Sequence, residues 1–206
     1  RAQAVTGSLT LAIDAKAKAM VAQGVDVIGF GVGEPDFNTP AHIVAAAKEA
    51  MDRGETRYTP STGTLALRKT VCEKLQRLNG LSYTPSQVVI SNGAKHALHN
   101  ALCAILEEGD EVLIVPPCWV SYPEMVKMAE GTPVIVYAGI EQDFKITPKQ
   151  LEAAITPKTK ALILCSPSNP TGSVYSKEEL AGLAAVLAKY PQVVVIADEI
   201  YEHINY

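Results

Sequence analysis

The fold is decided by residues 160–201, which read KALILCSPSNPTGSVYSKEELAGLAAVLAKYPQVVVIADEIY. Apolar runs at 160–165 and 192–197 predict two strands, and residues 176–189 between them predict a helix. Ser176 and Glu179 form the capping-box pattern that starts such a helix. Strands joined by a helix pair in parallel, and continuous Val, Ile and Leu runs are typical of strands covered on both faces.

The rest of the chain continues this alternation. Thr39 followed by Pro40 predicts a capped start for the helix after it. The whole pattern predicts an α/β fold, with a mostly parallel sheet and helices on both faces. We expect further strands at 25–28, 87–91, 111–115 and 133–137, and helices at 10–23, 41–53, 65–78, 94–107, 122–129 and 148–155.

The composition excludes several classes of protein. The chain has 206 residues, 48% of them hydrophobic, and a net charge of −4. We therefore expect neither nucleic acid nor a membrane as a partner, and no apolar run is long enough to span a bilayer. The scattered cysteines show no metal-ligand spacing, so we expect no metal site and a reducing, cytoplasmic location. Both ends of the chain look cut, which indicates part of a longer protein.

A glycine-rich turn follows the first expected strand. Gly29, Gly31 and Gly33 suggest a dinucleotide fingerprint, but that fingerprint opens directly into a helix. Here the glycines run into a turn at 34–38 instead. We interpret them as positions of tight backbone geometry or of close approach to a ligand.

Polar and aromatic residues lie where the expected strands end, at the edge where open α/β sheets bind ligands. Asp198 is either a turn cap or a carboxylate facing a pyridine nitrogen. Asn169 and Tyr201 could both hydrogen-bond a phenolate oxygen on that same ring. Trp119 either stacks on the ring or belongs to the core. Residues 91–95 (SNGAK) open a helix and are either an anion site or an ordinary turn.

Taken together, these segments resemble an aspartate aminotransferase of the bacterial subgroup within the class I, fold-type I aminotransferases, which depend on pyridoxal 5′-phosphate (PLP). The similarity runs almost end to end, and its last two segments are specific for the broad family. The matching segments are GVGEPDF (31–37), RYTP (57–60), SNGAK (91–95), WVSYPE (119–124), NPTG (169–172) and DEIYEH (198–203).

The resemblance implies where the cofactor would bind. Asn169 and Tyr201 would bond its phenolate oxygen, and Asp198 its ring nitrogen. Trp119 would stack on the pyridine ring and touch the substrate. The phosphate cup would consist of Gly93, Ala94 and Lys95.

The resemblance also implies contacts with the substrate and with a second subunit. Gly33 would offer its backbone to the substrate carboxylate, with Trp119 and Asn169 beside it. Tyr58 would reach the phosphate of the neighbouring subunit, so the active site would be shared across a homodimer. Two departures from the family pattern, Cys118 for tyrosine and Ser168 for asparagine, remove none of these contacts.

By the same resemblance, residues 1–35 would be a helix and arm on the small-domain side. Residues 36–206 would be an incomplete PLP-binding large domain, and the C-terminal small domain would be absent. The family's Schiff-base lysine follows the Asp198–Tyr201 pair, whereas the last lysine here is Lys189. We therefore expect this chain to contain no catalytic residue, to bind PLP without a covalent bond and to be inactive alone.

The function expected of the intact protein is transfer of the amino group of aspartate, or a related amino acid, to 2-oxoglutarate by a ping-pong mechanism. The partners would be amino-acid and 2-oxo-acid substrates. Alternatives are another fold-type I enzyme, such as an aromatic aminotransferase or a C–S lyase, and a non-catalytic PLP-fold binding module.

Overall fold

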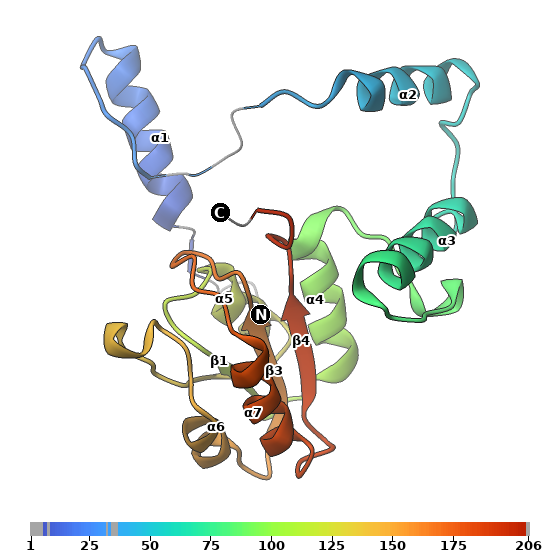
Figure 1. The fold of residues 1–206 in the computed structure, drawn as a ribbon. Helices are drawn as coiled ribbons and strands as arrows, with labels where there is room; N and C mark the ends of the chain where they lie inside the picture. Colours follow the sequence, from blue (N-terminus) through green and yellow to red (C-terminus); the bar gives the residue numbers. More distant parts are fainter. Residues whose placement is uncertain (1–5, 8, 32, 34–36, 205–206) are drawn as a thin grey trace. The chain divides into compact units, whose positions relative to one another are not determined.

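The computed structural model describes residues 6–7, 9–31, 33 and 37–204, and the ribbon in Figure 1 follows them along the chain. These residues divide into two compact units. One is formed by the described residues of 92–206 together with Thr6, and the other by those of 7–91. The assignment of residues 1–35 to the side of a small domain stays a prediction.

The unit that starts at Asn92 is built on a four-stranded sheet in which every neighbouring pair is parallel. The strands are β1 (Glu111–Ile114), β2 (Thr132–Ile135), β3 (Thr159–Cys165) and β4 (Val194–Asp198). Their order across the sheet is β2-β1-β3-β4. The register pairs Cys165 with Asp198, so β3 and β4 end side by side. The predicted α/β fold with a parallel sheet is confirmed.

Helices cover both faces of the sheet at β1 and β3, as their continuous apolar runs predict. The same prediction is wrong for β4, where Val194 and Val195 are exposed. Within β1, Val112 and Ile114 pack on one face while Leu113 packs on the other, because side chains alternate along a strand. The first face is covered by α4 (Gly93–Ile105) and α5 (Ser121–Met128), and the second by α6 (Pro148–Ala154) and α7 (Lys177–Leu187). Two apolar cores therefore hold the strand ends in fixed positions.

The helix α7 begins as its sequence predicts. The Ser176 hydroxyl accepts a hydrogen bond from the Glu179 backbone N–H at 3.1 Å, and the Glu179 carboxylate accepts one from the Ser176 N–H at 2.7 Å. This reciprocal pair satisfies two backbone donors that the first turn of a helix leaves free. The connection from β3 to β4 therefore has a defined helix start beyond its loop.

The unit formed by residues 7–91 is helical. It contains α1 (Leu9–Ala22), α2 (Ala41–Asp52) and α3 (Leu65–Lys74), which continues as a π-helical turn over Leu75–Asn79. The strands predicted at 25–28 and 87–91 are wrong, because neither segment is a strand in the structure or belongs to its sheet. The predicted Thr39 cap is also wrong, because Pro40 occupies the N-cap position of α2 and no side chain caps the helix.

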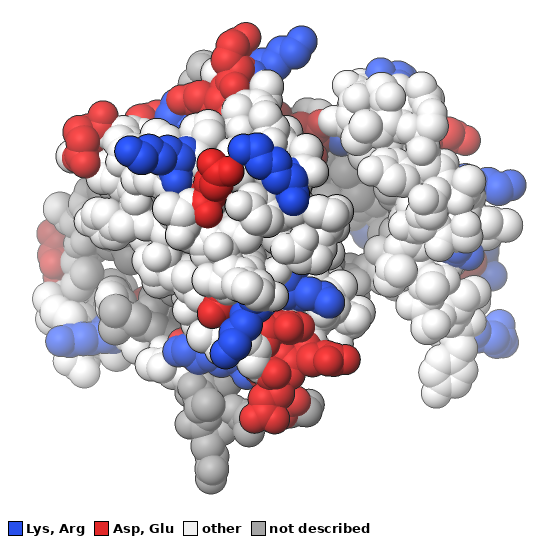
Figure 2. All heavy atoms as spheres, turned by 90° about the horizontal axis from the view of Figure 1, so that it is seen from below, with Lys and Arg blue, Asp and Glu red and all other residues white. Residues whose placement is uncertain are grey.

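Charged side chains of both signs lie on the face drawn in Figure 2. Lys and Arg are interspersed there with Asp and Glu, and the acidic side chains that gather toward the bottom of the view have basic ones beside them. None of the helices in the described part of the chain is long and apolar enough to cross a bilayer.

Candidate cofactor site

The candidate site lies where β1, β3 and β4 end. Asp198 is the last residue of β4, Asn169 lies in the loop after β3, and Trp119 lies in the loop after β1. Parallel strands end at one edge of the sheet, so these three predicted residues share that edge. The loop 166–176, which we call the Asn169 loop, connects β3 to the start of α7.

Asp198 is a buried carboxylate with two protein donors. The Tyr122 hydroxyl donates a hydrogen bond to Oδ2 at 2.6 Å, and the Ile200 backbone N–H donates one to Oδ1 at 3.2 Å. Asp198 is 9% exposed and Tyr122 is 2% exposed. The bond to Ile200 is the turn cap that the sequence left open as an alternative. Asp198 is therefore a turn cap whose carboxyl group is held in one orientation at the sheet edge.

Tyr122 was not among the predicted site residues. It projects from the first turn of α5, three residues after Trp119, and packs with the core that covers one face of the sheet. Burial raises the pKa of its hydroxyl far above the usual range, and the hydrogen bond to Asp198 raises it further. Tyr122 is therefore a neutral donor that orients the Asp198 carboxylate. The sequence did contain a signal for this residue, because Tyr122 lies near a predicted helix start and one turn after Trp119.

Asn169 and Tyr201 come together although 32 residues separate them in sequence. The Asn169 side-chain amide donates a hydrogen bond from Nδ2 to the Tyr201 hydroxyl at 3.1 Å. Both side chains line an open cleft of about 430 Å³, together with Gly172 and Ile204. Because the Tyr201 oxygen accepts this bond, its own O–H remains able to donate toward the cleft.

The predicted phosphate cup forms the start of α4. Gly93 has a φ of +80° and open space where a Cβ would be, so its backbone can be approached closely. Asn92, at the N-cap position, makes no side-chain capping bond, and α4 is 13 residues long. The first N–H groups of such a helix and its dipole favour an anion. The start of α4 thus has the properties that phosphate binding requires.

Aromatic and cationic side chains connect the start of α4 with Asp198. The Lys95 ammonium lies 4.9 Å from the centroid of the Trp119 ring, a cation–π contact. The Trp119 and Tyr122 rings meet edge to face, with centroids 5.6 Å apart and planes at 88°. Trp119 is half-buried against the apolar core, so both of its predicted roles, core and ring contact, remain compatible with its position.

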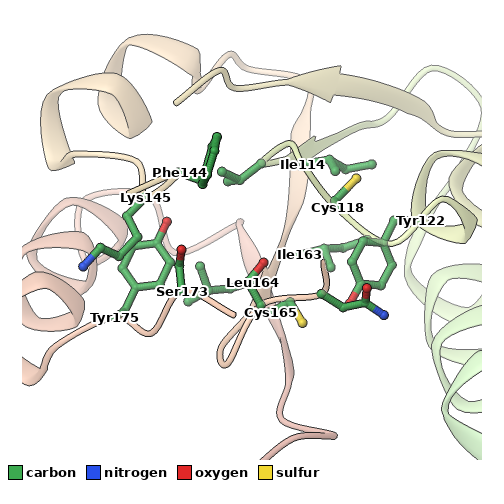
Figure 3. Close-up of a pocket in the computed structure, with 13 residues that line it drawn as sticks. Ile114, Cys118, Tyr122, Phe144, Lys145, Ile163, Leu164, Cys165, Ser173 and Tyr175 are labelled. Carbon is green, nitrogen blue, oxygen red and sulfur yellow. The ribbon is translucent and has the colours of Figure 1, made fainter. Parts of the chain in front are cut away.

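A small cavity lies behind these strand ends. Its volume of about 20 Å³ is close to that of one water molecule. In Figure 3, Phe144, Lys145, Ser173 and Tyr175 gather at one end of it and Cys118 and Tyr122 at the other. Burial raises the pKa of the Cys118 thiol, and the nearby Cys165 raises it further. Cys118 therefore behaves as a neutral lining group.

Two predicted residues belong to the other unit. Gly33 and Tyr58 lie within residues 7–91, and Tyr58 is fully exposed there. Their roles toward substrate and a neighbouring subunit stay predictions. All four cysteines are free thiols, and no group of three potential ligands among the described residues could hold a metal ion.

Residues 25–206 match the model of the family described as "Aminotransferase class I and II". The chain is 56% identical over 200 residues to an "Aspartate/prephenate aminotransferase" of Cereibacter sphaeroides, covering 97% of this chain and 50% of the relative. It is 52% identical over 206 residues to an "Aspartate aminotransferase" of Bacillus subtilis, covering 100% of this chain and 52% of the relative. The chain thus spans about half the length of the curated relatives it matches.

A solved structure gives the same relationship in three dimensions. The aspartate aminotransferase from Thermus thermophilus with maleate superimposes with a TM-score of 0.96 at 46% sequence identity. The alignment covers 100% of this chain and 53% of that one. The similarity therefore extends over both units described above.

Proposed function

The chain belongs to the class I and II aminotransferase family, and we propose that the complete protein transfers an amino group from an amino acid to a 2-oxo acid with the help of PLP. One observation carries the proposal: the buried Asp198 carboxylate and the hydrogen-bonded Asn169–Tyr201 pair both lie where the adjacent strands β3 and β4 end. An anion beside a pyridine nitrogen keeps that nitrogen protonated, and hydrogen-bond donors stabilise a phenolate oxygen, so these residues match the two polar edges of one ring.

The described residues suit the chemical groups of PLP. The cleft beside Asn169 and Tyr201, about 430 Å³, falls within the range of small-molecule sites. The start of α4, at Gly93, suits a dianionic phosphate because it offers free N–H groups and open space. Trp119 supplies an aromatic face next to Lys95. No polar group in the set conflicts with the cofactor.

PLP supplies an electron sink at its ring, and the chain's own residues set the charge around that ring. Asp198, ionised, would hold a proton on the ring nitrogen. Tyr122 would keep the carboxylate in one orientation, because its hydroxyl donates to Oδ2. Asn169 and Tyr201 would donate hydrogen bonds to the phenolate oxygen, and Gly93, Ala94 and Lys95 would surround the phosphate.

The finer parts of the proposal concern the complete protein. Its amino donor would be aspartate and its acceptor 2-oxoglutarate, exchanged by ping-pong kinetics in a cytoplasmic homodimer. The names of the relatives support aspartate. Tyr58 would reach the phosphate of the neighbouring subunit and Gly33 the substrate carboxylate. Lys189 forms an exposed ion pair with Glu152 at 2.9 Å, so we assign it no Schiff-base role and expect these 206 residues alone to be inactive.

The test is a two-step titration of the complete protein. Purified with PLP, it should show the absorbance of the bound cofactor, lose that absorbance with aspartate and regain it with 2-oxoglutarate. Failure to take up PLP would overturn the proposal. Uptake without an aspartate response would favour an aromatic aminotransferase, a C–S lyase or a binding module. Prephenate belongs among the acceptors tested, because the name of the relative from Cereibacter sphaeroides includes it.

A further inference from the structure

The Asn169 loop is held from behind by a short segment that the proposed chemistry does not use. This supporting segment, residues 143–146, precedes α6 and contacts the loop through three different kinds of group. The Ser173 hydroxyl donates a hydrogen bond to Asp143 Oδ1 at 3.0 Å. The Ile146 backbone N–H donates one to the Tyr175 hydroxyl at 2.9 Å. The Ile146–Tyr175 bond is buried, whereas the Ser173–Asp143 bond joins a buried hydroxyl to a carboxylate whose side chain is 63% exposed.

Lys145 adds an ionic contact to the same region. Its ammonium lies 2.9 Å from a Glu179 carboxylate oxygen and 3.4 Å from Asp143 Oδ2, and it donates to the Val174 carbonyl at 3.4 Å. The Lys145 side chain is 18% exposed. The hydrogen bond with Glu179 raises the pKa of Lys145, so the ammonium remains charged at neutral pH. One cation therefore connects the supporting segment, the Asn169 loop and the first turn of α7.

The backbone of the supporting segment is itself unusual. Asp143 has a φ of 54° and Phe144 a φ of 56°, so two consecutive non-glycine residues are left-handed. Such a conformation is unfavourable for a residue with a side chain and persists where the surroundings enforce it. Asp adopts this conformation more often than most residues do but less readily than glycine, and Phe is not among the residues that favour it. The strain is consistent with a segment shaped to present Asp143 and Lys145 to the loop.

The support can reach Asn169 through bonds inside the loop. The Ser168 N–H donates to the Ser173 carbonyl and the Gly172 N–H to the Ser168 carbonyl, each at 2.9 Å. Asn169 is thus enclosed in a small hydrogen-bonded turn whose base is Ser173. Displacing Ser173 would displace the Asn169 amide from the Tyr201 hydroxyl, a contact that has a length of 3.1 Å.

We propose that Asp143 is a positioning residue: by bonding Ser173, and with Lys145 beside it, Asp143 holds Asn169 where its amide meets Tyr201 and the cofactor's phenolate oxygen. This inference rests on the proposed function for its cofactor part. Its structural part, the order of the Asn169 loop, stands apart from that function and can be measured without PLP.

The experiment compares three substitutions at one position in the complete protein. Asp143→Ala removes the acceptor of the Ser173 bond. Asp143→Gly removes it as well but relieves the left-handed strain, and Asp143→Asn keeps an oxygen acceptor and tolerates the same φ. Hydrogen exchange is followed by mass spectrometry on a peptide covering residues 166–176, measured without PLP. None of the three changes alters the sequence of that peptide.

We expect exchange in this peptide to be about tenfold faster in Asp143→Ala and Asp143→Gly, the factor for losing one ordinary hydrogen bond. Asp143→Asn should stay near wild type. The dissociation constant for PLP should rise in the same order and by a similar factor. Thr156→Val is the matched control, because Thr156 donates a comparable hydroxyl bond to Glu111 at the opposite ends of the strands.

Wild-type exchange in Asp143→Ala and Asp143→Gly would overturn the proposal. Equal acceleration in Asp143→Asn, or in Thr156→Val, would overturn it too, because the Ser173 bond would then not be the cause. Faster exchange with unchanged PLP affinity would reject the cofactor part. If the wild-type protein takes up no PLP, the proposed function fails, while the exchange data still decide whether Asp143 holds the loop.

Discussion

The helices of the two units differ in what their apolar side chains contact. In the unit that starts at Asn92, α4 buries Leu98 and Leu102 against the sheet, and α5 buries Tyr122 and Val126. In the unit of residues 7–91, α2 and α3 contain no buried residue. Yet all four were predicted from the sequence by the same criteria. Helix formation is thus a local property, whereas the stabilisation of a helix comes mainly from the packing of one of its faces.

The largest expected difference is in the unfolding free energy lost when a core leucine or a surface isoleucine is replaced by alanine. Leu102 of α4 is 0% exposed, whereas Ile43 of α2 is 49% exposed. Leu102→Ala should lower the free energy of unfolding of this chain by about 2–5 kcal/mol, through lost burial and the cavity left behind. Ile43→Ala should change it by less than about 0.5 kcal/mol. Urea unfolding followed by circular dichroism measures both, and equal losses would break the comparison.

Two tyrosines allow the same comparison between a buried and an exposed position, here for a hydroxyl group. Tyr122→Phe removes the donor to the buried Asp198 carboxylate and should cost about 1.5–3 kcal/mol, as for other hydrogen bonds to charged groups. Tyr58→Phe, at a fully exposed position, should leave the unfolding free energy unchanged within about 0.5 kcal/mol. Both substitutions keep the aromatic ring, so the same urea titration isolates the hydroxyl. If Tyr122→Phe leaves the free energy of unfolding unchanged, Asp198 has found another hydrogen-bond donor.

The next pair compares two expected helix caps, one in each unit. Ser176→Ala removes a formed capping bond from α7 and should cost about 1 kcal/mol. Thr39→Ala removes a hydroxyl that does not cap α2 and should cost less than about 0.5 kcal/mol. Thermal unfolding of the two variants measures the difference. If Thr39→Ala loses as much stability as Ser176→Ala, Thr39 caps α2 as the sequence predicts.

The features that the sequence predicted best are those determined by residues close together along the chain. The capping box at Ser176 depends on local pattern, and the strand predicted at 192–197 depends on a continuous apolar run. The structure contains both, with the strand at Val194–Asp198. The run at 25–28 has the same apolar character but no partner strand among the described residues, and a strand needs one. Strand ends also indicated that Asn169 and Tyr201 meet, because parallel strands share one edge.

Hydrogen bonds between residues far apart along the chain could not be predicted from the sequence. Tyr122 bonds Asp198 across 76 positions, and Ser173 bonds Asp143 across 30. Each of these bonds depends on the final packing of a helix or loop and not on a motif. The sequence and its resemblance to a family predict the residues that would touch the cofactor, whereas neither indicates the hydrogen bonds of Tyr122 and Asp143.

The smallest expected effect is a pH dependence at the start of α7. The Ser176 backbone N–H and the Lys145 ammonium lower the pKa of Glu179, so its carboxylate is bonded better in the folded than in the unfolded chain. A lowered folded pKa means that this stabilisation is present above the ordinary glutamate pKa and is lost as pH falls through the folded value. Glu179→Gln should therefore be less stable than wild type near pH 7, and the gap in unfolding free energy should close toward pH 3.

Glu178→Gln, on the same helical turn and exposed, is the matched control. Urea unfolding across this pH range measures both variants, and a gap that widens in acid would reverse the assignment.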